Sequence, residues 1–214
     1  MAFPERGLSK VRYATIIAAA LAYLVSEQGH AVGMMSMTNG SLSYVPARGG
    51  RPHLRALLAK LDRMEASGTW DPARTIARGA QLLQRRGVVI AISDFYDAEE
   101  ETRRELRRVV QRGHDVAMLQ LLSPTERSLP FTGSIELQDM ESNGRQLVDA
   151  TAMAATYEAA VTEFLERCRT CARRDGIDYS LMTTDMPPEQ ALRDYLLRRS
   201  RRETSGHTRS TGSS

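Results

Sequence analysis

The residues best placed to do chemistry follow a short apolar run in the middle of the chain. Residues 87–93 have no helical period, and the run ends on the pair Ser93-Asp94. Such a run is typical of a buried parallel strand, and ligands of open α/β sheets bind outside the carboxyl ends of such strands. The Asp94 carboxylate is therefore a candidate metal ligand or binding group. The alternative is that Asp94 caps the helix that follows, as aspartate commonly does.

The elements around this strand alternate between helical and strand patterns, which predicts a mostly parallel sheet with helices on both faces. Ser9 suits the N-cap of a helix over residues 9–28, and Pro72 suits the first turn of a later helix. Asn39-Gly40 predicts a hairpin, which we expect to form an antiparallel edge of the sheet. Further helices are expected from about residues 54, 98, 152 and 188, and further strands over residues 116–122, 134–137, 146–148 and 179–182.

Composition indicates one globular α/β domain. The chain has 214 residues, 42% of them hydrophobic, and a formal net charge of +3. Arginines concentrate only near the C-terminus, so binding of nucleic acid through this Arg-rich region is the alternative function. From residue 200 onward the Ser, Thr, Gly and Arg content predicts a disordered tail over residues 200–214. The basic residues of the Arg-rich region are Arg193, Arg198, Arg199, Arg201, Arg202 and Arg209.

Enzymatic motifs are absent from the sequence. A haloacid-dehalogenase-like phosphatase needs a second Asp two residues after the first, and Tyr96 stands at that position after Asp94. The chain has no Gly-x-Ser-x-Gly elbow and no Gly-Lys-Ser/Thr phosphate loop. Cys168 and Cys171 lie in a helical pattern without a second ligand pair, so core or surface positions are expected for both. We therefore expect a non-enzymatic protein.

The sequence predicts a cytoplasmic protein with no membrane contact. The N-terminal residues lack the apolar segment of a secretion signal. The longest apolar stretch, residues 14–25, is shorter than the roughly 20 residues that a membrane helix needs. A buried core helix is the expectation for this stretch.

A series of short motifs resembles the bacterial domain-of-unknown-function family 58 over residues 7–199. That family is similar to the von Willebrand factor type A fold, whose members bind partner proteins through a divalent ion. The resemblance implies a von Willebrand factor A-like domain over residues 1–199 that binds protein, often beside an AAA+ ATPase of the MoxR type. The motifs, in chain order, are Gly7-Leu8-Ser9-Lys10, Gly68-Thr69, Ser93-Asp94-Phe95, Pro124-Thr125-Glu126 and Gly176-Ile177-Asp178-Tyr179.

The same resemblance implies an ion site of which this chain carries only a part. Thr69 and Asp94 match two ligand positions of the family, and oxygen ligands of this kind suit Mg²⁺. The Asp-x-Ser-x-Ser motif, expected just before Gly7 after a first, central strand, does not occur, and Ser123 stands where the family usually has Asp. The chain is then expected to be the C-terminal part of a longer protein or the product of a shortened reading frame. Without the ion, Thr69 is a helix-start or turn residue.

Overall fold

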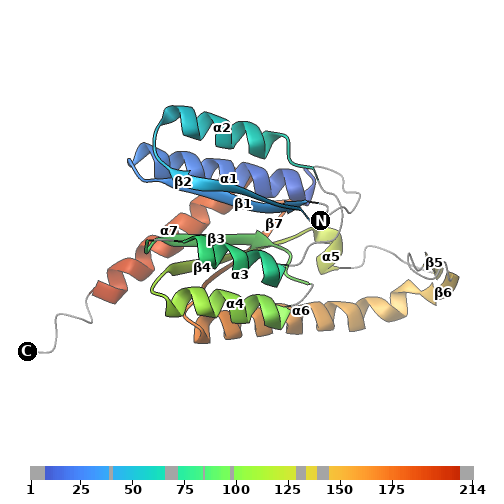
Figure 1. The fold of residues 1–214 in the computed structure, drawn as a ribbon. Helices are drawn as coiled ribbons and strands as arrows, with labels where there is room; N and C mark the ends of the chain where they lie inside the picture. Colours follow the sequence, from blue (N-terminus) through green and yellow to red (C-terminus); the bar gives the residue numbers. More distant parts are fainter. Residues whose placement is uncertain are drawn as a thin grey trace, which may run out of the picture.

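The computed structural model describes residues 8–38, 41–65, 72–83, 85–96, 99–128, 134–138 and 145–207 (Figure 1). Helices and strands alternate along most of this length, as the patterns predicted. In chain order they are α1 (Lys10–Glu27), β1 (Val32–Thr38), β2 (Ser41–Arg48), α2 (Arg51–Asp62), α3 (Pro72–Leu82), β3 (Val88–Ser93), α4 (Glu99–Gln111), β4 (Asp115–Leu122), α5 (Pro124–Arg127), β5 (Ser134–Gln138), β6 (Arg145–Asp149), α6 (Ala150–Arg174), β7 (Asp178–Thr183) and α7 (Pro188–His207).

Three parallel strands form the main sheet, in the order β3-β4-β7. Strand β4 lies between two neighbours, and every residue of β4 after Asp115 is buried. The prediction of a buried strand at residues 87–93 is only half right, because β4 is the one strand that pairs with β3 among the described residues. Val88, at its start, is 55% exposed. The last residue of β3, Ser93, is fully buried.

Helices cover both faces of this sheet, which confirms the predicted α/β class (Figure 1). On one face α1 and α7 pack against β4 and β7, through a core that includes Tyr13, Ile17 and Tyr195. On the other face α3, α4 and α6 pack against the same strands, with Leu106 and Val109 at the centre. The result is a three-layer sandwich in which each layer buries one face of the next.

The two predicted hairpins are present, but neither joins the main sheet. Strands β1 and β2 pair antiparallel from Val32↔Arg48 to Thr38↔Ser41, and they form a sheet of their own. The expectation that this hairpin is an edge of the main sheet is wrong, since no described strand pairs with β1 besides β2. The turn residues Asn39 and Gly40 lie outside the described residues. Strands β5 and β6 form a third sheet before α6.

The last helix is longer than composition predicted. It begins at Pro188 but continues to His207, so residues 200–207 are helical where a disordered tail was expected. Ala191, Leu192 and Tyr195 bury its first half against the sheet, and a helix that is already nucleated extends at small cost per residue. Residues 208–214 lie outside the described part. Within that part, no helix has the length and apolarity that crossing a bilayer requires.

Replacement of a residue at the centre of β4 tests this architecture. Leu121 is fully buried beneath α1 and α7, so Leu121→Ala removes apolar contacts and leaves a cavity. We expect a loss of about 2–5 kcal/mol in the free energy of unfolding, measured by urea denaturation. The control Leu197→Ala, on a side chain of α7 that is 49% exposed, should change stability by less than about 0.5 kcal/mol. Equal losses in the two variants would contradict the described core.

Candidate functional site

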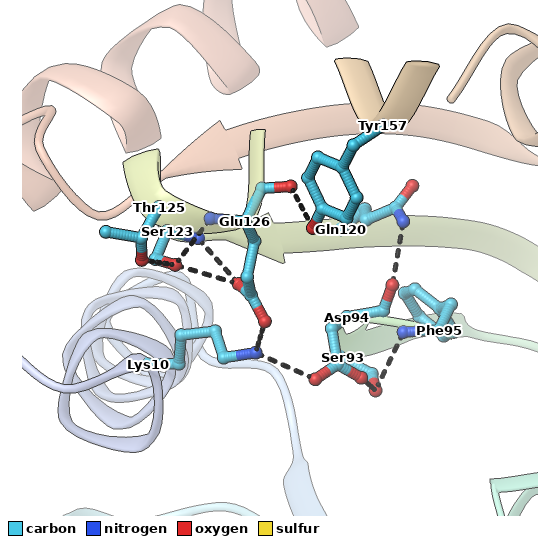
Figure 2. A network of polar contacts seen from close by, with 9 residues as sticks. All are labelled: Lys10, Ser93, Asp94, Phe95, Gln120, Ser123, Thr125, Glu126 and Tyr157. Carbon is cyan, nitrogen blue, oxygen red and sulfur yellow. Dashed lines mark hydrogen bonds and ion pairs between the residues drawn. The ribbon is translucent and has the colours of Figure 1, made fainter. Parts of the chain in front are cut away.

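One ammonium group lies between two carboxylates at the carboxyl end of the main sheet (Figure 2). Lys10 Nζ is 3.0 Å from Asp94 Oδ2, and it also donates a hydrogen bond to Glu126 Oε1. The Lys10 side chain is 2% exposed and each carboxylate 15% exposed. The three residues come from the start of α1, the end of β3 and the short helix α5. We call this group the Lys10 cluster.

Asp94 is held in place by its neighbours on β3 and β4. Ser93 Oγ donates to Asp94 Oδ1 at 3.3 Å, and Gln120 Nε2 donates to the Asp94 carbonyl at 2.7 Å. Tyr179 Oη donates to Gln120 Oε1 at 2.7 Å and so fixes that amide. Phe95 has a φ of +57°, a conformation that bulky residues rarely adopt, and it is 1% exposed. Burial of this ring stabilises the turn that presents Asp94.

Glu126 is held by a capping box at the start of α5. Ser123 Oγ accepts the Glu126 N–H at 3.3 Å, and Glu126 Oε2 accepts the Ser123 N–H at 2.8 Å. One carboxylate oxygen of Glu126 therefore caps the helix while the other meets Lys10. Tyr157 Oη also donates to the Glu126 carbonyl at 3.0 Å, which ties α6 to the site. Ser123, at the position where the family usually has Asp, serves as the N-cap.

Charge pairing decides the protonation of the buried ammonium. Burial acts to lower the pKa of Lys10, but the hydrogen bonds to Glu126 and Asp94 and the charges of both carboxylates outweigh it. The pKa of Lys10 is therefore raised above its ordinary value of 10.5. Lys10 stays charged over the physiological range. A buried cation of this kind is stable only while both partners remain.

The described residues do not fit a magnesium ion at Asp94. Mg²⁺ requires near-octahedral oxygen coordination at about 2.1 Å, whereas the Lys10 ammonium already bonds to both nearby carboxylates. Within the described ranges no group of three or more His, Cys, Asp and Glu side chains could hold a metal. Thr69, the other ligand that the resemblance implied, lies outside those ranges.

The remaining sequence candidates lie away from the Lys10 cluster or serve packing. Cys168 and Cys171 are free thiols on α6, and burial, with the charge of Glu99, raises the pKa of Cys168 to about 12. A thiol with such a pKa is a poor nucleophile at neutral pH. Tyr96 stacks on Phe164 with 5.0 Å between ring centroids. These contacts join α6 to the end of β3.

The Arg-rich region is partly used in holding α7 to the sheet. Arg198 donates to Ser180 Oγ at 2.6 Å, and Arg199 pairs with Asp115 and Asp178. Asp115 and Asp178 are the first residues of β4 and β7, so these contacts lie at the amino end of the strands, opposite the Lys10 cluster. The charge of Arg199 is thus compensated within the fold. This arrangement does not favour a nucleic-acid site there.

Sequence reasoning quoted Lys10 and Glu126 in motifs but assigned no role to either. The spacing from Ser123 to Glu126 is the signature of a capping box, and it could have placed a helix start at that point. No comparable signal exists for Lys10. Its partners lie 84 and 116 residues away, and only the fold brings them together.

Comparison with known proteins identifies the family to which the chain belongs. The family model for "Protein of unknown function DUF58" matches residues 1–167, which is most of the chain and begins earlier than the motifs indicated. The chain therefore belongs to this family, as the motifs predicted.

Curated relatives come from mycobacteria. An uncharacterized protein of Mycobacterium tuberculosis is 33% identical over 132 residues, which cover 60% of this chain and 41% of that protein. An uncharacterized protein of Mycobacterium avium is 31% identical over 138 residues, covering 59% of this chain and 80% of that protein. The chain thus spans less than half the length of the tuberculosis relative.

Two solved structures share the fold. An aerotolerance-related membrane protein from Bacteroides fragilis superimposes with a TM-score of 0.53 at 14% identity, over 87% of this chain and 86% of that one. The conserved hypothetical protein BatB from Bacteroides thetaiotaomicron gives 0.50 at 12% identity, over 89% and 88%. At such identities the likeness establishes the fold alone, and it agrees with the predicted von Willebrand factor A-like class.

Removal of the Lys10 ammonium should lower the free energy of unfolding more than removal of a surface cation does. Lys10→Met leaves two carboxylates without their partner, so we expect a loss on the order of 3 kcal/mol in urea denaturation. The control Arg12→Met, in the same helix as Lys10, breaks an exposed pair with Asp62 of α2 and should cost less than about 1 kcal/mol. Adding Asp94→Asn and Glu126→Gln to Lys10→Met should recover part of the loss. A Lys10→Met variant as stable as the parent would contradict the cluster.

The pH dependence of the folding stability follows from the direction in which folding shifts the pKa of Lys10. Because folding raises the pKa of Lys10, its contribution is complete below the ordinary value of 10.5 and is lost as pH rises through the folded-state pKa. The stability difference between parent and Lys10→Met should therefore be constant from neutral pH to about pH 9 and shrink above pH 10.5. Thermal melts at stepped pH measure this difference. A stability difference between the two proteins that grows as the pH rises would contradict a raised pKa of Lys10.

Magnesium should leave the stability of the chain unchanged. A ligand that binds only the folded protein stabilises it by about 2.7 kcal/mol at a concentration 100 times its Kd. Since the carboxylates of Asp94 and Glu126 are bonded to Lys10, we expect equal melting temperatures in millimolar MgCl₂ and in EDTA. An increase of several degrees with MgCl₂ that disappears in Asp94→Asn would establish an ion site.

Proposed function

We propose that this chain is a non-enzymatic protein-interaction module that works in the cytoplasm with a MoxR-type AAA+ ATPase. The Lys10 cluster carries the proposal. It fixes the start of α1, the end of β3 and α5 at the edge of the sheet where α/β proteins bind their ligands. The cluster therefore forms a rigid base for a binding surface.

The bonding within the cluster supports a binding role over an acid–base role. A general acid or base must reach the proton that it transfers. Here Asp94 accepts from Ser93 and Lys10, while Glu126 accepts from Lys10 and from the Ser123 backbone. Each titratable group is thus bonded to another part of the protein.

Exposed apolar side chains flank this base. Leu8, just before α1, is 38% exposed, and Tyr96, two residues after Asp94, is 38% exposed. Tyrosine is enriched among the residues that dominate binding energy, and an exposed leucine beside it adds apolar area that binding removes from water. We infer that Leu8 and Tyr96 belong to the contact surface. The choice of a MoxR-type partner rests on the family resemblance, since family members often accompany such ATPases.

A matched pair of leucine variants tests the proposed surface. Leu8→Arg introduces a charge at the proposed contact, whereas Leu197→Arg introduces the same charge on α7, two residues before Arg199 and so near the amino end of the strands. With a purified MoxR-type ATPase from the same genome, we expect Leu8→Arg to weaken binding at least about tenfold and Leu197→Arg to leave it unchanged. Biolayer interferometry with and without ATP measures both.

The outcome of this experiment tests the choice of partner and the choice of binding surface separately. Absence of binding by the parent chain would reject the MoxR-type partner. Equal binding by the parent and Leu8→Arg would reject the surface around the Lys10 cluster while leaving the partner in place.

A further inference from the structure

The turns that lead into the three parallel strands gather at one end of the molecule, where α7 leaves the sheet (Figure 1). A Cβ at Gly113 would be 2.8 Å from Arg86 Nε, so the turn before β4 lies against the turn before β3. A Cβ at Gly176 would be 3.6 Å from Val110 Cγ1, which places the turn before β7 against the end of α4. These turns form one surface at the amino end of the sheet, opposite the Lys10 cluster.

Arginines give this surface a positive charge. The aspartates described in and beside these turns already have basic partners from the helices. Arg199 pairs with Asp115 and Asp178, and Arg103 donates to Asp175. The exposed arginines of the turns are therefore an excess of charge at this end. We call the surface that they define the amino-end face, and its arginines are Arg85, Arg86, Arg112, Arg173 and Arg174.

Large apolar side chains are also exposed at this end of the molecule. Helix α1 begins at the Lys10 cluster on the carboxyl end of the sheet, so its last turns lie at the amino end. Val88 is the first residue of β3, and Leu197 stands two residues before Arg199 on α7. These elements bring apolar surface to the same end as the arginines. The exposed apolar side chains are Tyr23, Leu24, Leu83, Val88, Leu196 and Leu197.

Arginines beside exposed aliphatic side chains suit an anionic membrane surface. Guanidinium groups bind phosphate oxygens, and basic residues are attracted to the negative potential of anionic phospholipids. Leucine and valine side chains gain free energy when they leave water for the boundary of the acyl chains. A nucleic acid would use the arginines equally well, but its bases stack on aromatic rings and gain little from aliphatic side chains. The aliphatic residues therefore favour a membrane over a nucleic acid.

We propose that the amino-end face docks on a membrane surface that contains anionic phospholipids. The expectation of no membrane contact rested on the lack of a spanning segment, and a peripheral contact needs none. The net charge of +3 conceals this face, because carboxylates such as Asp94, Glu99 and Glu126 lie at the opposite end of the sheet. Docking in this orientation leaves the surface around the Lys10 cluster directed away from the bilayer. The inference goes beyond the proposed function and does not depend on it.

Co-sedimentation of the 214-residue chain with lipid vesicles tests the charge of this face. Vesicles of phosphatidylcholine with phosphatidylserine should bind the chain at least about tenfold more tightly than phosphatidylcholine alone. Arg85→Gln with Arg86→Gln should weaken this binding at least about tenfold, since each basic residue near an anionic surface contributes about fivefold. The matched control, Arg12→Gln with Arg127→Gln, removes the same charge from exposed positions at the carboxyl end and should change binding less than about threefold.

A pair of leucine variants tests the apolar part of the face in the same assay. Leu197→Ser removes an apolar side chain from the proposed contact and should weaken binding to the anionic vesicles at least about threefold. The control Leu42→Ser makes the same change at an exposed position near the start of β2, where the hairpin lies at the carboxyl end. Its binding should equal that of the parent chain.

Three outcomes overturn the proposal. Equal binding to neutral and anionic vesicles rejects an anionic lipid surface, and equal losses in the two arginine pairs reject the amino-end face. Tighter binding of mixed-sequence RNA than of vesicles, measured by fluorescence anisotropy, assigns the face to a nucleic acid. If circular dichroism shows that Arg85→Gln with Arg86→Gln is unfolded, Arg173→Gln with Arg174→Gln at the end of α6 takes its place. No ATPase is present in these assays, so failure here and failure of the proposed partner are distinguishable.

Discussion

The carboxyl end of the main sheet depends on one buried ammonium group. Lys10 joins Asp94 after β3 to Glu126 in α5, two residues that are 32 positions apart in sequence. Each carboxylate needs a positive partner because it is largely shielded from water. The same contact sets where α1 starts relative to the sheet. The ion pair therefore positions the candidate surface and the helix that covers the core.

The cluster also changes the chemistry that the family resemblance implied. An aspartate at the end of a parallel strand suits a divalent ion, but a lysine ammonium bonded to that aspartate supplies a cation from the chain itself. Ser123 continues this difference, since it caps α5 through its hydroxyl and adds no third carboxylate. The described end of the sheet is therefore organised by hydrogen bonds and a single ammonium charge.

Helices, rather than strand pairing, hold the two larger sheets of this chain together. Tyr13 and Ile17 reach the parallel sheet, while the small residues Ala18, Ala19 and Ala22 of the same helix pack toward β1 and α2. Gly79 has the same role on the other face, where its lack of a side chain lets α3 approach Met35. Small residues on both helices thus allow α1 and α3 to pack closely against β1. The likeness to two Bacteroides structures at 12–14% identity shows that this layered fold tolerates extensive change of sequence.

The sequence by itself determined the elements, because their signals are local. Ser9 caps α1, Pro72 begins α3, and the apolar run before Asp94 forms β3, each by spacing within a few residues. The disorder predicted from composition is wrong for residues 200–207, which are helical. The buried side chains of Leu192 and Tyr195 hold the first half of α7 against the sheet, and the helix continues from there. The tertiary structure alone decided that Lys10 meets Asp94 and Glu126 and that β1 lies apart from β3. Ion pairing and strand pairing act between residues that are distant in the chain, and no local pattern encodes which of them meet.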